Sequence, residues 1–86
     1  DALWTLLNEG KILQLDERHF IFSEEHAKII NRLKKFKRNQ GDVLTFDDLR
    51  EMTGYSRKYL IVLFENWDRQ GVTQRLGNRR KILLGA

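Results

Sequence analysis

Three glycines each close a segment in which apolar side chains recur every three or four residues. That spacing is typical of helices that bury one face, and glycine is favoured just beyond a helix end because it tolerates the left-handed backbone conformation. A chain with several such glycine-terminated segments is expected to fold as a small, mainly helical unit. The predicted helices cover residues 24–40, 46–53 and 57–70, and the glycines are Gly41, Gly54 and Gly71.

Polar residues suited to begin a helix precede these segments. Ser23 and Ser56 offer hydroxyl groups as N-caps, and Thr45 with Asp48 has the pattern of a capping box in which Asp replaces the more usual Glu. In the last helix, apolar positions at i, i+3, i+4 and i+7 define a buried face. That face consists of Leu60, Leu63, Phe64 and Trp67.

The opening of the chain predicts a helix and a two-stranded ribbon. Residues 2–8 have helical apolar spacing and precede a capping glycine, and strand-like runs follow at 11–15 and 19–22. The connection between the two runs has the length of a hairpin loop. We expect one group of large apolar side chains here to be core rather than binding surface: Trp4, Leu7, Phe20 and Phe22.

A second hairpin is predicted at the end of the chain. Residues 72–76 and 80–84 are strand candidates joined by a tight connection around Gly77-Asn78. Strict alternation puts Leu76 and Leu83 on the same face as Arg79 and Lys81, which predicts a bulge or a longer loop. Val43-Leu44 either pairs as a further strand or simply packs.

The order helix, short helix, glycine-containing turn, helix and hairpin defines a winged helix-turn-helix. The predicted fold class is therefore mainly α with small antiparallel β ribbons. The helix-turn-helix covers residues 46–70 and the wing residues 72–84, within a unit of residues 23–86.

The composition excludes several classes of function. The 86 residues contain no cysteine, so disulfides and thiolate zinc sites are excluded, and no apolar run approaches the roughly 20 residues of a membrane span. His19 and His26 lack partners at metal-ligand spacing, and His26 is expected to be solvated in the first turn of its helix. Neither a phosphate-loop motif nor a nucleophile–base pair is present. We therefore expect no metal, no cofactor and no enzymatic activity.

The net charge of +4 is unevenly distributed. Residues 23–41 carry +4 and residues 56–86 carry +5, whereas residues 1–22 carry −2 and residues 42–55 carry −3. Two basic blocks separated by an acidic one suggest one side that faces a polyanion. Charge alone leaves nucleic acid, an acidic protein and a membrane surface as alternatives.

Basic side chains gather at two places. At the start of the third helix, cations join backbone N–H groups and a positive dipole end, an arrangement that suits phosphate. In the hairpin, four cations within seven positions repel one another unless an anion binds. The alternatives are a capped helix with solvated cations and a hairpin edge protected by charge. The basic face from Lys28 to Arg38 is expected to be solvated.

Two stretches resemble a known family. DDLREMTGYSRKY (residues 47–59) and ENWDRQGVTQRLGNRR (residues 65–80) are similar to the C-terminal winged-helix domain of the bacterial selenocysteine-specific elongation factor, SelB. The pattern combines a Thr-Gly turn, Ser-Arg-Lys, an aromatic-Asp-Arg helix end and Gly-Val-Thr-x-Arg-x-Gly, over roughly residues 45–82. Residues 1–22 resemble the recognition helix and wing that end the preceding domain, so we expect this chain, which starts at Asp1, to be a fragment.

The resemblance implies a module that binds the selenocysteine insertion hairpin of mRNA in the cytoplasm, away from membranes. Ribosome and selenocysteyl-tRNA would be partners of the parent factor, a GTPase whose GTP-binding part lies outside this chain. Gln74 stands where many relatives are expected to carry a further basic residue. The RNA contacts implied are Ser56, Arg57, Lys58 and Tyr59 at the helix start, with Arg75, Asn78, Arg79, Arg80 and Lys81 on the wing.

Two other functions remain open at this point. Winged helices usually read the DNA major groove, which favours a double-stranded DNA-binding regulator, although no Asn or Gln stands beside Arg57 and Lys58. The fold also serves as a protein-interaction module in larger assemblies, and exposed Ile61, Val62 and Trp4 would then be its anchors.

Overall fold

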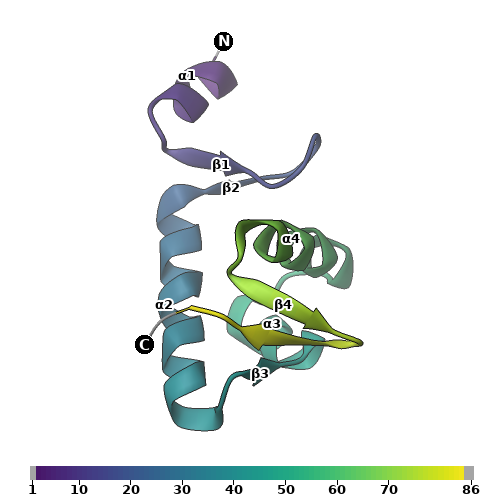
Figure 1. Cartoon of the computed structure of the whole chain (residues 1–86). Helices are drawn as coiled ribbons and strands as arrows, with labels where there is room; N and C mark the ends of the chain where they lie inside the picture. The colour runs from purple at the N-terminus through teal and green to yellow at the C-terminus, as the bar shows by residue number, and fades with distance from the viewer. Residues whose placement is uncertain (1, 85–86) are drawn as a thin grey trace.

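The computed structural model describes residues 2–84 and shows a winged helix carrying a helix and a ribbon at one end (Figure 1). The long helix α2 (Ser23–Gln40) lies along one side, beside the helices and small sheet of the second half of the chain, and α1 (Ala2–Asn8) lies beyond the ribbon. The first half comprises α1 (Ala2–Asn8), β1 (Ile12–Gln14), β2 (Phe20–Phe22) and α2 (Ser23–Gln40). The second half comprises β3 (Val43–Leu44), α3 (Phe46–Thr53), α4 (Arg57–Gln70), β4 (Thr73–Leu76) and β5 (Arg79–Ile82).

Two antiparallel sheets flank α4. Strands β1 and β2 form the ribbon, whereas β3, β5 and β4, in that order, form a three-stranded sheet whose last two strands are the wing. Val43-Leu44 therefore pairs as a strand, against Lys81 and Arg80. Because β5 lies in the middle, both of its neighbours fix its register.

The prediction of a bulge or longer loop in the wing is wrong. The strands pair without interruption, Leu76 opposite Arg79, around a two-residue turn. Gly77 has a φ of +63° and Asn78 has no positive φ, a combination found in type II′ hairpins. Leu76 and Arg79 do share the outer face of the sheet, as strict alternation requires. No bulge is needed because Leu76 is left 44% exposed there.

Local capping follows the sequence closely. In the Thr45 capping box, the Asp48 N–H donates to Thr45 Oγ1 at 3.1 Å and the Thr45 N–H donates to Asp48 Oδ2 at 3.0 Å. Ser56 Oγ accepts from the Tyr59 N–H at 3.4 Å. Ser23 is not an N-cap, because β2 continues directly into α2 and the cap position falls on Phe22; Ser23 Oγ donates instead to the Gly10 carbonyl at 2.6 Å.

The core joins the ribbon to the winged helix. Leu15 and Ile21 of the ribbon belong to the same buried cluster as the predicted face of α4. Each such fully buried side chain contributes about 1.5–3 kcal/mol relative to exposure. The buried cluster consists of Leu15, Ile21, Ile29, Leu33, Leu44, Leu49, Leu60, Leu63, Phe64, Trp67 and Ile82.

The predicted apolar group at the start of the chain is only partly core. Leu7 and Phe20 are half-buried, but Trp4 is 64% and Phe22 65% exposed. The reason is that α1 is a seven-residue helix with no buried residue, so it covers the ribbon without enclosing it. Among residues 2–84, no helix is long and apolar enough to cross a bilayer.

Candidate nucleic-acid interface

The first turn of α4 is solvent-facing and positively charged. Arg57 and Lys58 are exposed and follow the exposed cap Ser56. The backbone N–H groups of this turn have no acceptor within the helix, apart from the one that Ser56 Oγ serves. Free backbone N–H groups, the positive end of the helix dipole and two exposed cations thus occur together in this turn, a combination that favours anions.

The register of the wing separates its cations by face. Arg75 lies opposite Arg80 on the side of the sheet that faces the helices, whereas Arg79 and Lys81 lie on the outer face. Arg75 is exposed near the tip, where its Nε contacts the Gly77 carbonyl at 3.4 Å. The free cations therefore surround the tip instead of forming one flat patch.

Arg80 is a structural side chain in this arrangement. It is 5% exposed, and its Nε donates to Asp68 Oδ2 at 3.2 Å. The guanidinium carbon lies 4.8 Å from the centre of the Phe64 ring, and Asp68 Oδ1 accepts from Thr73 Oγ1 at 2.7 Å. Arg80 thus holds the wing against α4, and its charge is already compensated.

One aromatic ring brings the helix start and the wing together. The guanidinium carbon of Arg57 lies 4.8 Å from the centre of the Phe46 ring, and that of Arg80 lies 5.9 Å from the same centre. Cation–π contact of this kind fixes the direction of an otherwise flexible arginine. Phe46, which sequence reasoning missed, therefore connects the two predicted basic regions.

Tyr59 points away from solvent, toward the ribbon. Its hydroxyl group donates to the Phe20 carbonyl at 2.8 Å, and its ring meets Tyr55 edge-on at 4.9 Å. Burial raises the pKa of Tyr59 above its ordinary value. The hydroxyl is thus already engaged within the protein.

The prediction that His26 is solvated is wrong. Its Nε2 accepts a hydrogen bond from Trp67 Nε1 at 2.9 Å, and the ring is half-buried. Desolvation lowers the pKa of His26 below its usual value, so the neutral ring is favoured. In the described part of the chain, no group of three or more potential metal ligands occurs.

An apolar groove adjoins the start of α4. It has a volume of about 550 Å³ and lies between the α1–ribbon end and α4. Ser56, Tyr55 and Tyr59 form its α4 side, and Leu3, Leu6 and Phe22 line the opposite side. The cationic first turn of α4 thus lies next to a mainly apolar groove, in which Glu25 is the one charged lining residue among those that the structure describes.

The fold and this site define a winged-helix domain whose basic recognition-helix start and basic wing tip face solvent. Sequence comparison then identifies the family: residues 34–82 match the family described as "Elongation factor SelB, winged helix". Because the match covers more than half of the chain, this chain belongs to that family.

Individual relatives agree with this assignment. The chain is 27% identical over 77 residues, or 90% of its length, to a selenocysteine-specific elongation factor of Desulfomicrobium baculatum, of which it spans 12%. It is also similar in fold to the mRNA-binding domain of elongation factor SelB from E. coli, solved in complex with SECIS RNA. That match has a TM-score of 0.78 and 23% identity, and covers 96% of this chain and 68% of the other.

Proposed function

We propose that this chain is the RNA-binding module of a selenocysteine-specific elongation factor and binds the selenocysteine insertion hairpin of mRNA. The observation that carries the proposal is the exposed set of cations at the start of α4 and around the wing tip, in a member of this winged-helix family. The structurally similar E. coli domain was solved with SECIS RNA, which supports the same ligand class.

The geometry suggests which RNA phosphates each cation contacts. Arg57, Lys58 and the first-turn N–H groups contact phosphates beside the helix start, and Arg75 extends this contact along the wing. Arg79 and Lys81 reach phosphates on the outer side of the wing, with Asn78 at the turn between. Arg80 acts indirectly, since it fixes the wing through Asp68.

A hairpin suits this surface better than a uniform duplex does. The major groove of A-form RNA is too narrow and deep for a helix to enter, so specific contacts are made with loops and bulges. Beyond its first turn, the exposed strip of α4 continues with Ile61 and Glu65, which offer no attraction to phosphate. The same strip makes reading of a DNA major groove along α4 unfavourable.

The wider role concerns the parent protein. We expect that protein to contact the ribosome and selenocysteyl-tRNA in the cytoplasm, with GTP bound by another part of its chain. The present module would contribute binding and no catalytic step.

A titration at several salt concentrations tests the proposal. A hairpin with a loop and a bulge should bind more tightly than a perfect duplex of equal charge. Its affinity should fall with salt at a log–log slope of roughly −3 to −5, because about four to six phosphates are neutralised. Equal affinity for hairpin and duplex would contradict specific recognition.

A matched pair of variants locates the surface. Arg57→Gln should weaken hairpin binding by about 1–3 kcal/mol. Lys35→Gln, which removes one exposed cation from α2, should have little effect because the wing projects away from α2 (Figure 1). If both variants weaken binding equally, long-range attraction and not this site accounts for the affinity.

A further inference from the structure

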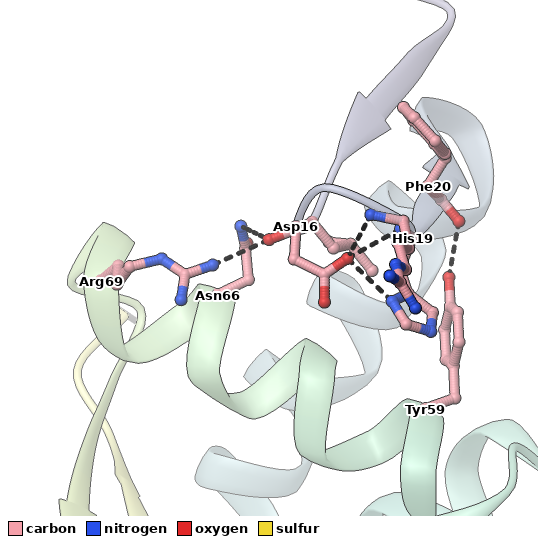
Figure 2. Close-up of polar contacts among 8 residues, drawn as sticks. Asp16, His19, Phe20, Tyr59, Asn66 and Arg69 are labelled. Carbon is pink, nitrogen blue, oxygen red and sulfur yellow. Dashed lines mark hydrogen bonds and ion pairs between the residues drawn. The ribbon is translucent and has the colours of Figure 1, made fainter.

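One carbonyl group next to the ribbon strands accepts two side-chain hydrogen bonds from α4. The Leu15 oxygen accepts from Asn66 Nδ2 at 3.3 Å and from Arg69 Nη2 at 2.8 Å (Figure 2). Residues three apart on a helix lie on one face, so the two donors converge naturally. Both lone pairs of this carbonyl are thereby used by side chains of the recognition helix.

A second hydrogen bond between α4 and the ribbon lies two turns away along α4. Tyr59 Oη donates to the Phe20 carbonyl at 2.8 Å. Since Tyr59 and Asn66 are seven residues apart, the two contact points are separated by about 10 Å along the helix axis. Leu15 and Phe20 flank the loop 16–19, so α4 holds the ribbon at both ends of its tip.

The tip also has hydrogen bonds of its own. Asp16 Oδ1 accepts from the backbone N–H groups of Arg18 and His19, each at 2.8 Å, and lies 2.8 Å from His19 Nδ1. The Leu15 N–H donates to the His19 carbonyl at 2.8 Å. These bonds connect the two ends of the tip, so loss of a contact with α4 is expected to weaken them as well.

We propose that Tyr59, Asn66 and Arg69 are positioning residues that lock the ribbon onto the recognition helix, so that RNA bound at the start of α4 keeps a fixed orientation relative to α1. These contacts, which we call the seam, act at two points about 10 Å apart and so resist rotation of a ribbon that buried Leu15 and Ile21 already attach to the core. The RNA part of this inference rests on the proposed function; the locking itself does not.

Hydrogen exchange in the protein without RNA tests the lock. In Tyr59→Phe and in Asn66→Leu/Arg69→Met, the Leu15 amide should exchange about five- to tenfold faster for each hydrogen bond lost. Arg69→Lys, which keeps a donor, should restore most of the protection. Glu65→Gln and Gln70→Ala are controls at exposed positions of the same helix. Unchanged Leu15 exchange in both seam variants would overturn the proposal.

Distance measurements test orientation, a property that overall stability does not report. Because the chain has no cysteine, Ala2→Cys places one spin label on α1 and Lys35→Cys a second on α2. The distance distribution should be narrow with the native seam and broader, or shifted, in Asn66→Leu/Arg69→Met. Circular dichroism and the Trp67 signal confirm that this variant is folded. A distribution that stays narrow would overturn the lock.

A label on the hairpin stem then measures the RNA against Ala2→Cys. The seam variant should bind the hairpin with unchanged affinity but with a broader distance distribution. If the RNA distribution stays as narrow as in the native seam, the orienting role is wrong. If the hairpin fails to bind the unaltered protein, the proposed function fails, while hydrogen exchange and the α1–α2 distances still decide the lock.

Discussion

The ribbon and the wing are both antiparallel hairpins packed on α4, but α4 holds them through side chains of opposite charge. The ribbon is fastened by a cation of the helix, Arg69, which is exposed but donates a hydrogen bond to the Leu15 carbonyl. The wing is fastened by an anion of the helix, Asp68, which compensates Arg80 on the inner face of the wing. The other wing cations, Arg75, Arg79 and Lys81, are exposed.

The comparison shows that whether a cation in a basic segment can bind a ligand depends on the groups of the protein that already hold it. Arg79 and Arg80 are neighbours in sequence, yet one is exposed and the other is buried against Asp68. Arg69 and Arg80 are both committed to the fold. Within the two basic regions of the wing and the start of α4, the exposed cations are Arg57, Lys58, Arg75, Arg79 and Lys81.

The largest expected effect comes from releasing the wing. Asp68→Ala leaves the buried Arg80 without its counter-ion and Thr73 Oγ1 without its acceptor. Such a loss destabilises by about 3–5 kcal/mol, measured by urea unfolding. Glu65→Ala on the same helix should change stability by less than about 0.5 kcal/mol, and Asp68→Asn should fall between. Equal effects of the two alanine variants would show that the Asp68–Arg80 pair does not hold the wing.

A second prediction separates binding cations from structural ones. Arg75→Gln/Arg79→Gln should weaken hairpin RNA binding by about 1–3 kcal/mol for each contact and flatten the salt slope by about 0.9 for each. Thermal stability should be unchanged because both side chains are exposed. Arg69→Gln should lower the thermal stability, because it removes the hydrogen bond to the Leu15 carbonyl, and should leave RNA binding and its salt slope unchanged. A steady salt slope in the wing variant would remove the tip from the proposed interface.

His26 gives a pH test of the segment between the two hairpins. Burial lowers its pKa in the folded protein below the unfolded value of 6.5, so its contribution to stability is full above that pH and declines as the pH falls. His26→Gln keeps an acceptor for Trp67 but does not titrate. Between about pH 7 and pH 5, wild type should lose more stability than this variant in urea unfolding. Parallel losses would mean that His26 titrates normally.

The smallest effect is local to the ribbon tip. The Arg18 N–H, and then the His19 side chain, lower the pKa of Asp16 below 3.8. Its stabilisation is therefore present above pH 3.8 and lost as the pH falls through the lower folded value. Asp16→Asn should speed exchange of the Arg18 and His19 amides without changing the unfolding midpoint. Glu17→Gln should leave both amides unchanged; an equal response would assign the effect to net charge.

Features set within a few residues were predictable from the sequence. The Thr45–Asp48 capping box, the Ser56 cap and the buried face of α4 are all confirmed, because each depends on neighbours along one helix. The winged-helix fold followed from their order. The wing turn at Gly77-Asn78 was correctly located for the same reason, although its regular register was not foreseen.

Contacts between distant residues were not predictable in this way. Asn66 meets Leu15 across 51 positions, and Trp67 meets His26 across 41. Nothing in the local spacing indicates which surface a helix presents to a ribbon. The sequence places Arg80 among the wing cations and Tyr59 among the RNA contacts, but it does not indicate the Asp68–Arg80 pair or the bond from Tyr59 to the Phe20 carbonyl.

Four consecutive residues of α4 contact three neighbouring elements: Asn66 and Arg69 bind the ribbon, Trp67 binds α2 and Asp68 binds the wing. Inserting one residue between Lys58 and Glu65 would rotate the two ends of the helix by about 100° relative to each other. With the carboxyl end held by three elements, Arg57 would be swung away from Phe46. The span from Ser56 to Asn66 therefore tolerates substitution at exposed positions such as Ile61 and Glu65, but it does not tolerate a change of length.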